Sequence, residues 1–173
     1  MKRIAIQGEL GSFHDITAHQ YFEGEQIELI CCATFEEVFE NIKRDPTVVG
    51  ICAIENTIAG SLLHNYELLR QSGTTVVGEH KLRIEHSICC LPDDDWNTLQ
   101  EVHSHPVALM QCGKFLANHP DLKAVEAEDT AGSAAYIAQH KVHGWAAICS
   151  SYAAQMYGMK VLQEDIHDNP HNY

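Results

Sequence analysis

The chain has 173 residues, of which 45% are hydrophobic, so it can bury a sizeable core in one domain or in two small lobes. Its formal net charge is -13, from 11 Lys and Arg against 24 Asp and Glu. This balance argues against nucleic acid or an anionic membrane as a partner, because either would require a basic surface.

The N-terminus and the cysteines predict a cytoplasmic protein. The opening residues, MKRIAIQGELGSF, hold too few apolar side chains before a glycine turn to form the core of a signal peptide. No apolar run approaches the length that spans a membrane. The seven cysteines include no C-x-x-C motif, and most lie in apolar, strand-like runs. Such cysteines are typical of reduced, buried thiols.

The chain begins with alternating short strands and helices. We expect a strand at residues 2–7 and then, after a glycine turn, a helix that Ser12 caps and that ends near Phe22. A strand at residues 27–33 precedes a second helix, which Thr34 caps. The predicted apolar face of this second helix consists of Phe35, Val38, Phe39 and Ile42.

The stretch VVGICAIENTIAGS comes next and carries the first candidate site. Its opening part, Val48–Ile54, is continuously apolar and rich in β-branched residues, which predicts a strand buried on both faces. Glu55, Asn56 and Thr57 follow at the carboxyl end of this strand. Ligands bind at that edge in open α/β sheets. The alternative is that Glu55 and Asn56 simply turn the chain.

The remaining elements continue the alternation. We expect a helix at about residues 60–71 and two extended runs at residues 74–84 and 86–91. Further strands are predicted at residues 99–103, 123–126, 145–149 and 160–166. Further helices are predicted at residues 106–118, at residues 130–140 and after a cap at Ser150 or Ser151.

This order of elements implies an α/β fold with mostly parallel strands covered by helices. The long run at 74–84 breaks the rhythm and predicts a crossover into a second lobe. We therefore expect lobe 1 at residues 1–78, joined by a returning tail at 167–173, and lobe 2 at residues 79–166. Two such lobes would place a ligand cleft between them. A single doubly wound domain is the alternative.

Polar residues recur where a strand ends and a helix starts. A hydroxyl at a helix N-terminus can cap the helix, and the free backbone N–H groups beside it attract anions. Capping alone can explain any one of these residues. Because no Walker loop or G-x-G-x-x-G motif is present, a small carboxylate is the preferred ligand. The residues concerned are Ser12, Glu55, Asn56, Thr57, Ser104, Thr130 and Ser150.

Several segments, in this order and spacing, closely resemble the catalytic domain of prephenate dehydratase. The most specific are the Glu-Asn-Thr turn and the Ser-His-Pro helix that ends in Gln-Cys, and the resemblance covers essentially the whole chain. The segments are GELGSFHDITA, CAIENTIAGS, VHSHPVALMQC, DTAGSAAYIA and AAICSSYAAQMYGMKVL.

The resemblance implies a fold and an activity. The fold would be two α/β lobes of the periplasmic-binding-protein type (type II) around a cleft. The activity would be that of a lyase converting prephenate to phenylpyruvate, water and carbon dioxide in phenylalanine, and hence aromatic amino acid, biosynthesis. It calls for no metal or organic cofactor, and it implies a homo-oligomer, either a dimer or a tetramer.

The family's site motifs fall on named residues of this chain. They make Glu55 and Asn56 the candidate catalytic residues, with Glu55 either a general acid or a group that orients a threonine hydroxyl. The candidate substrate-binding residues are Ser12, Thr57, Ser104, Gln111 and Thr130. Ser104 is also placed to cap the helix that follows it.

Gln111 lies seven residues beyond Ser104, on the same helix face but about 10 Å further along. One ligand atom cannot contact both side chains. Gln111 therefore either contacts the other end of an extended ligand or braces the second lobe.

The sequence departs from the family pattern in three places. Glu9 stands where the family usually has proline, and Thr57 where it usually has serine. The family's catalytic threonine belongs to an Asn-x-Thr-Arg-Phe motif, whereas this sequence reads Asn172-Tyr173 at its end. We expect the natural reading frame to continue into Thr-Arg-Phe. A C-terminal regulatory domain is not present in this sequence, and L-phenylalanine is expected as a regulator only if such a domain exists.

Two other chemistries are less favoured. The histidine pairs come without the Cys or carboxylate partners of a zinc signature. Cys112 has no base near it in sequence and is expected to stay a thiol. The histidine pairs in question are His103 and His105, His140 and His143, and His167 and His171.

The alternative function is a two-lobed module that binds a small carboxylate without catalysis.

Overall fold

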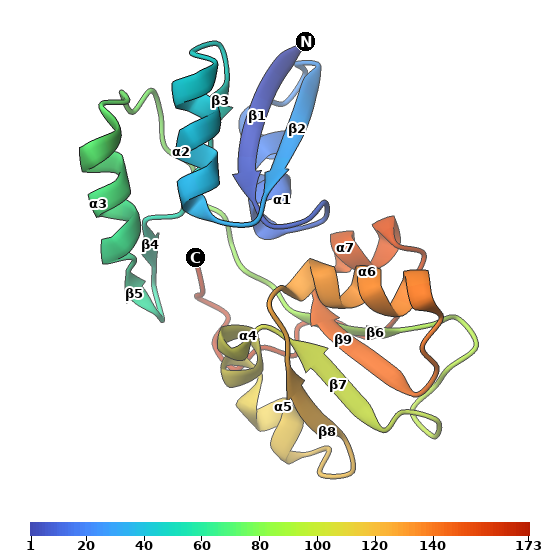
Figure 1. Ribbon diagram of the computed structural model, residues 1–173. Helices are drawn as coiled ribbons and strands as arrows, with labels where there is room; N and C mark the ends of the chain where they lie inside the picture. The colour runs from blue at the N-terminus through green and yellow to red at the C-terminus, as the bar shows by residue number, and fades with distance from the viewer. The chain divides into compact units, whose positions relative to one another are not determined.

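The computed structural model describes residues 1–173, and the chain divides into two compact α/β units (Figure 1). The first unit comprises Met1–Glu9, Phe13–Arg83 and Tyr173, and the second comprises Leu10–Ser12 and Ile84–Asn172. The predicted α/β class is therefore confirmed.

The division differs in position from the predicted one. It falls after Arg83 rather than after residue 78, and residues 167–172 of the tail belong to the second unit. Backbone hydrogen bonds explain the difference for this tail. Ile166 N donates to His86 O at 3.0 Å, and Asp168 N donates to Gln111 O at 2.7 Å.

The first unit is built on a three-stranded parallel sheet in the order β2-β1-β3. Its strands are β1 (Lys2–Gln7), β2 (Ile27–Cys32) and β3 (Val49–Gly50), and its helices are α1 (Phe13–Tyr21), α2 (Phe35–Arg44) and α3 (Leu63–Ser72). The central strand β1 is buried at Ile4, Ala5 and Ile6.

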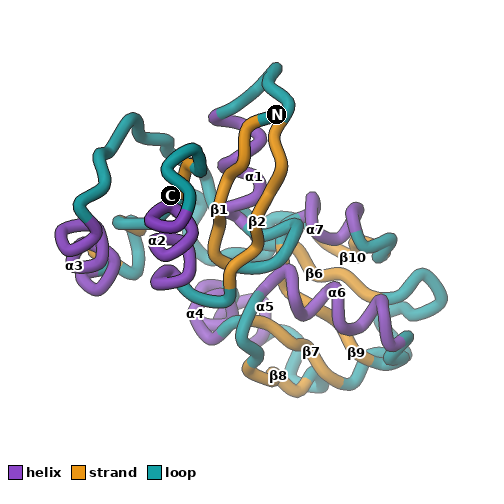
Figure 2. The backbone as a smooth tube through the Cα atoms, turned by 45° about the horizontal axis from the view of Figure 1, so that its top comes forward, coloured by secondary structure: helices purple, strands orange, loops and turns teal.

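Helices α1 and α2 both lie beside strand β1 (Figure 2), and alternate residues of the strand pack with different helices. Ile4 and Ile6 pack with Ala18 of α1 and with Phe22. Ala5 packs instead with Val38 of α2, among other residues. Because side chains alternate along a strand, α1 and α2 cover opposite faces of the sheet.

Helix α2 begins and packs as its sequence predicts. Thr34 is its N-cap, since the Thr34 side chain accepts a hydrogen bond from Glu37 N, and the Glu37 carboxylate accepts one from Ala33 N. Gly50 of β3 lies against this helix. A Cβ atom there would meet Ile42 Cδ1 at 2.5 Å and Val38 Cγ1 at 2.9 Å, so a larger residue would have to displace side chains of the helix.

The predicted buried strand at Val48–Ile54 is wrong in extent and burial. Only Val49–Gly50 forms a strand, Ile51 N adds a hydrogen bond to Ala5 O at 2.9 Å, and Ile54 is 36% exposed. The physical reason is that β3 is an edge strand of this sheet. An apolar run shows that a segment is extended, but it does not show how many strands flank it.

A short hairpin follows in place of the expected helix start. Its strands are β4 (Glu55–Asn56) and β5 (Gly60–Ser61), which pair antiparallel, and α3 begins only at Leu63. Gly60 has a φ of +84°, which suits glycine at the end of the turn.

The extended run expected at residues 74–84 forms no strand. The run is irregular, and Val76 and Val77 are 64% and 75% exposed. Ile84 N donates to Asn172 O at 2.8 Å, but no ladder extends along the run. β-branched composition favours extended backbone, whereas a strand also needs a neighbour.

The second unit is built on a five-stranded mixed sheet in the order β10-β6-β9-β7-β8. Strand β7 runs parallel to β8 and β9, whereas β6 runs antiparallel to β9 and β10. The prediction of mostly parallel strands therefore holds for the first unit but not for this one. The strands are β6 (Ser87–Cys90), β7 (Glu101–Ser104), β8 (Lys123–Glu126), β9 (Trp145–Cys149) and β10 (Lys160–Gln163).

Helices pack on both faces of this sheet. Ile88 and Ile148 belong to one buried cluster with residues of α4 and α5, and Cys89 and Cys149 to another with residues of α6 and α7. The helices are α4 (Pro106–Gln111), α5 (Gly113–Ala117), α6 (Thr130–His140) and α7 (Ser151–Met156). No helix of the protein is both long and apolar enough to cross a membrane.

Local sequence signals predict the start of α7 correctly, but they miss the break at Cys112 and the cap of α6. The single helix predicted at 106–118 is broken at Cys112, whose φ of -112° and ψ of 28° leave the helical region. The N-cap of α6 is Asp129, which accepts from Gly132 N, rather than Thr130. Ser150 caps α7 as predicted, with its hydroxyl oxygen accepting from Ala153 N.

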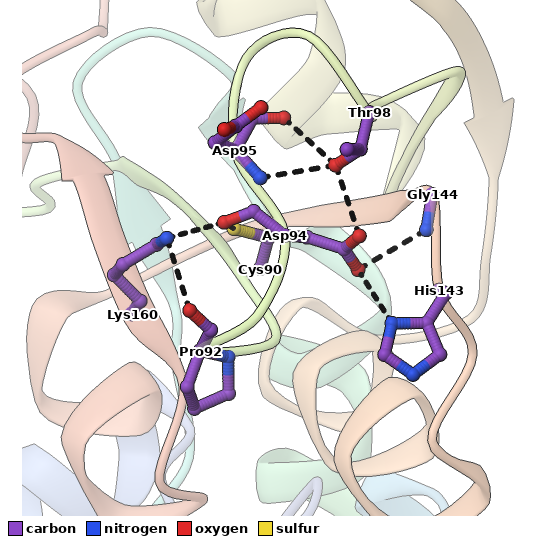
Figure 3. A network of polar contacts seen from close by, with 8 residues as sticks. All are labelled: Cys90, Pro92, Asp94, Asp95, Thr98, His143, Gly144 and Lys160. Carbon is purple, nitrogen blue, oxygen red and sulfur yellow. Dashed lines mark hydrogen bonds and ion pairs between the residues drawn. The ribbon is translucent and has the colours of Figure 1, made fainter.

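A buried carboxylate organises the loop between β6 and β7 (Figure 3). Asp94 is 4% exposed and accepts hydrogen bonds from Thr98 Oγ1 at 2.9 Å and from Gly144 N at 3.1 Å. His143 Nδ1 lies 3.4 Å from Asp94 Oδ2, the oxygen that also accepts from Gly144 N, and Lys160 Nζ donates to the Asp94 carbonyl. Asp94 thereby joins the loop to the start of β9.

We predict that Asp94→Ala lowers the free energy of unfolding of the second unit by about 2 kcal/mol, because the buried Gly144 N–H loses its acceptor. Urea unfolding followed by tryptophan fluorescence measures this change, since Trp96 and Trp145, the only two tryptophans, both lie in that unit. Asp93→Ala is the control, because Asp93 is exposed. Equal midpoints for the two variants would contradict the role of Asp94.

Candidate active site

The β4–β5 hairpin of the first unit carries three of the candidate residues. Asn56 Oδ1 accepts hydrogen bonds from Ile58 N at 3.0 Å and Ala59 N at 2.8 Å, which closes the turn on itself. Asn56 Nδ2 donates to Tyr173 O at 3.0 Å. The Asn56 amide therefore shapes the turn and also holds a residue that is distant in sequence.

Two hydrogen bonds join Thr57 and Tyr173, one between their backbones and one to the Thr57 hydroxyl. Thr57 N donates to Tyr173 O at 3.0 Å, and Tyr173 N donates to Thr57 Oγ1 at 2.9 Å. Lys81 Nζ lies 4.1 Å from the centre of the Tyr173 ring, at a distance typical of a cation–π contact. Together with Asn56, these contacts fix the position of Tyr173 beside the hairpin.

Glu55 is held by two hydroxyl groups. Its Oε1 atom accepts a hydrogen bond from Ser61 Oγ at 3.0 Å and another from Tyr66 Oη at 2.7 Å. Both donors reach the same oxygen, so Oε2 faces neither of them. Glu55 is exposed, which corrects the expectation that it sits at the head of a buried strand.

The contact with Glu55 changes the pKa of the Tyr66 hydroxyl. The hydrogen bond to Glu55, followed by partial loss of hydration and the negative charge of Glu55, raises the pKa of Tyr66 above its ordinary value. The helix that carries Tyr66 is anchored by its neighbour Asn65, which is 2% exposed and donates to Ala53 O at 2.7 Å. A buried amide thus fixes α3 against the segment that leads into Glu55.

Gln111 of the second unit sits in a buried polar group. It is 7% exposed, and its Oε1 atom accepts from His86 Nε2 at 2.8 Å and from Asn172 Nδ2 at 3.0 Å. His86 and Asn172 are 2% and 0% exposed. Gln111 therefore does brace part of the second unit, one of the two roles that its position in sequence allowed.

Ser104 does not cap a helix. It is fully buried at the end of β7, and its hydroxyl donates to Ile148 O at 2.6 Å. The N-cap of α4 is His105, whose Nδ1 accepts from Val107 N. The capping expectation fails because proline at the first helical position moves the cap to the residue just before it.

Ser12 and Thr130 lie in the second unit at the starts of helices. Ser12 is 6% exposed, and the adjoining Leu10 and Gly11 carbonyls accept hydrogen bonds from Tyr157 Oη and Ser150 Oγ. Thr130 is half-buried as the first residue of α6.

Cys112 follows Gln111, and its thiol is expected to be unreactive. Burial, and then the negative charge of Asp168, raise the pKa of its thiol to about 12. A thiol in that state supplies almost no thiolate at neutral pH. This agrees with the prediction that Cys112 is not a nucleophile.

The structure thus gathers Glu55, Asn56 and Thr57 in the first unit and places Ser12, Ser104, Gln111 and Thr130 in the second. It also shows hydrogen-bond partners of the candidate residues that the sequence did not predict. Ser61 had a readable signal, because a tight turn ending in glycine puts it opposite Glu55 in a hairpin. Tyr66 and His86 had none, since their contacts depend on folding, whereas Asn172 had been singled out only as part of the terminal motif and not as a partner of Gln111.

Comparisons with known proteins give a consistent result. A family model described as prephenate dehydratase matches residues 4–173. The bifunctional chorismate mutase/prephenate dehydratase of Escherichia coli (strain K12) is 33% identical over 163 residues, which cover 93% of this chain and 42% of that relative. Arogenate dehydratase 1 of Petunia hybrida is 34% identical over 171 residues, covering 98% and 40%. The chain therefore spans about two fifths of the length of these relatives.

Solved structures agree in fold. The prephenate dehydratase of Staphylococcus aureus subsp. aureus Mu50 superposes with a TM-score of 0.81 at 24% identity, covering 98% of this chain and 62% of that one. A structure described as GqqA, a novel type of quorum quenching acylase, superposes with a TM-score of 0.86 at 28% identity, covering 98% and 60%. These likenesses establish the arrangement of strands and helices.

We predict that Glu55→Ala lowers the pKa of Tyr66 toward the ordinary tyrosine value of about 10. The variant removes both the hydrogen bond and the negative charge that favour the neutral hydroxyl. A pH titration of the tyrosine ring carbons by NMR measures the change. Glu67→Ala is the matched control, because that neighbouring carboxylate binds Arg70 rather than Tyr66. An unchanged Tyr66 titration in Glu55→Ala would refute the contact.

Proposed function

The chain belongs to the prephenate dehydratase family, and we propose that it catalyses the conversion of prephenate to phenylpyruvate, water and carbon dioxide. The family inferred from the sequence motifs is confirmed by the match over residues 4–173. The proposal concerns the activity and substrate of the protein that contains this chain. It is carried by one observation above all, the Glu55 carboxylate held in place by two hydroxyl donors.

The reaction makes modest demands on the protein. Prephenate loses a ring hydroxyl and a carboxylate together, and aromatisation supplies the driving force. The protein needs to hold the substrate in one orientation and to stabilise the departing hydroxide. Fixed hydrogen-bonding groups are sufficient for both tasks.

Glu55 is the group we assign to the leaving hydroxyl. Because Ser61 and Tyr66 both bind Oε1, the carboxylate cannot rotate freely, and Oε2 keeps a defined direction. Oε2 would accept a hydrogen bond from a hydroxyl that it orients, or would donate its proton when Glu55 is protonated. Both roles that the sequence left open for Glu55 use this same oxygen.

Asn56 and Thr57 would act indirectly, by holding the backbone of Tyr173. Their polar atoms bind Tyr173, so their contribution to catalysis would be to fix that residue and the turn. On this view Asn56 is a positioning residue for Glu55, which directly precedes it.

Gln111 is the group we assign to a substrate oxygen in the second unit. The carboxamide offers one NH₂ donor after its oxygen has been used by His86 and Asn172. A carboxylate or carbonyl oxygen of the substrate is the matching acceptor. Ser104 and Thr130 would support the local backbone, as would Ser12.

Two competing activities define the test. Several relatives are named arogenate dehydratases, and arogenate carries an amino group where prephenate has its side-chain ketone. Acyl transfer, suggested by the structure described as an acylase, would need an activated nucleophile beside a base. Cys112 is not in that state, and the Ser104 hydroxyl is bound to a backbone carbonyl.

The intact natural gene product should be assayed with prephenate and, separately, with arogenate. We expect phenylpyruvate to form from prephenate, as followed by its ultraviolet absorbance. Faster turnover of arogenate would move the proposal to the amino substrate. Saturable binding of prephenate without product would favour the alternative, a carboxylate-binding module without catalysis.

We predict that Glu55→Gln lowers kcat by about a hundred-fold or more, because one well-placed acid or transition-state hydrogen-bonding group is removed. The fold should survive, since Glu55 is exposed and a glutamine oxygen can still accept from Ser61. Glu67→Gln, one residue after Tyr66, is the control and should retain full turnover. If Glu55→Gln kept wild-type kcat, Glu55 would be only a turn residue.

A further inference from the structure

His86 is the buried histidine of the second unit, and no sequence motif pointed to it. It lies directly before β6, is 2% exposed and contacts Gln111, the last residue of α4. Asn172 reaches the same glutamine oxygen from the tail of the unit. Three segments far apart in sequence thus meet at one carboxamide.

The two contacts determine which way the carboxamide points. A glutamine side chain has one acceptor oxygen and one NH₂ donor, and the two exchange places when the amide turns over. His86 Nε2 and Asn172 Nδ2 both approach the oxygen, at 2.8 Å and 3.0 Å. With the His86 proton on Nε2 and Asn172 Nδ2 as the second donor, the reversed amide would set donor against donor at both contacts, so the orientation of Gln111 is tied to the tautomer of His86.

In that orientation both contacts use the oxygen of Gln111, so the NH₂ group is left available as a donor. An oxygen atom of a bound ligand is a suitable acceptor for this group.

His86 can bind the Gln111 oxygen only as a hydrogen-bond donor at Nε2. Burial lowers the pKa of His86, with the bond to Gln111 acting in the opposite direction and the charge of His167 adding to the decrease. The ring is therefore neutral at neutral pH and carries a single N–H. The contact with Gln111 requires that proton on Nε2.

We propose that His86 is a positioning residue, whose Nε2–H group holds the Gln111 carboxamide so that its NH₂ group faces an oxygen of the substrate. The proposal rests on the proposed function for the identity of that substrate. His86 itself does not touch the substrate. Its effect is to keep the donor of Gln111 in place before the ligand arrives, which reduces the cost of binding.

Two substitutions of His86 in the intact protein separate positioning from packing. His86→Gln places an amide NH₂ near the position of Nε2, whereas His86→Leu fills a similar volume without a donor. We expect KM for prephenate to rise about ten-fold in His86→Leu with kcat little changed, because a contact made equally in ground and transition states is weakened. His86→Gln should stay within about three-fold of wild type.

The controls exclude a merely structural effect. Thermal unfolding of both variants reports on stability, and His119→Leu removes another histidine of this unit, which bonds Phe115 O away from Gln111. His119→Leu should keep the wild-type KM. An unchanged KM in His86→Leu, or an equal rise in His86→Gln and His86→Leu, would overturn the proposal.

An NMR measurement tests the same contact without relying on turnover. Long-range proton–nitrogen correlation spectra of the His86 ring distinguish the two neutral tautomers. We expect the proton on Nε2, and a proton on Nδ1 would overturn the proposal. If the wild-type protein did not convert prephenate, the proposed function would fail while this measurement still decided whether His86 holds Gln111.

Discussion

The hydrogen bonds that hold the last two residues of the chain underlie the rest of the candidate site. Asn172 is fixed within the second unit by Gln111, and Tyr173 is fixed within the first by Asn56 and Thr57. Three of these partners are the same residues that the family motifs single out. The side chains of Asn56 and Thr57 and the oxygen of Gln111 are therefore bonded to the tail before any ligand binds, whereas the NH₂ group of Gln111 is not used by the tail.

This commitment separates Glu55 from its neighbours. Asn56 and Thr57 bond to the tail, whereas Glu55 is bound only by the hydroxyls of Ser61 and Tyr66. Side-chain hydroxyls can exchange partners with a ligand at small cost, because no secondary structure depends on them. Within the hairpin, Glu55 is thus the residue best suited to chemistry, and the other two are suited to holding it.

The sequence predicted what local signals control. The helix after Thr34 and the helix after Ser150 begin where a side-chain oxygen caps them, and that oxygen lies within three residues of the N–H it accepts from. The run at 74–84 has the composition of a strand but forms no ladder, because strand pairing depends on neighbours supplied by the fold. Tyr66 and His86 could not be predicted, since their partners are distant in sequence.

Charge sets the last constraint on the site. A net charge of -13 would repel an anion such as the substrate that we propose, yet solution screening limits that repulsion to about 8 Å at physiological ionic strength. Recognition must therefore come from groups that touch the ligand. The Gln111 amide donor is neutral and pre-oriented by His86, so it can bind an anionic oxygen without adding a buried charge that would need its own counterion. An acidic protein can in this way hold a carboxylate through fixed dipoles, and the orientation of those dipoles then matters more than the overall charge of the chain.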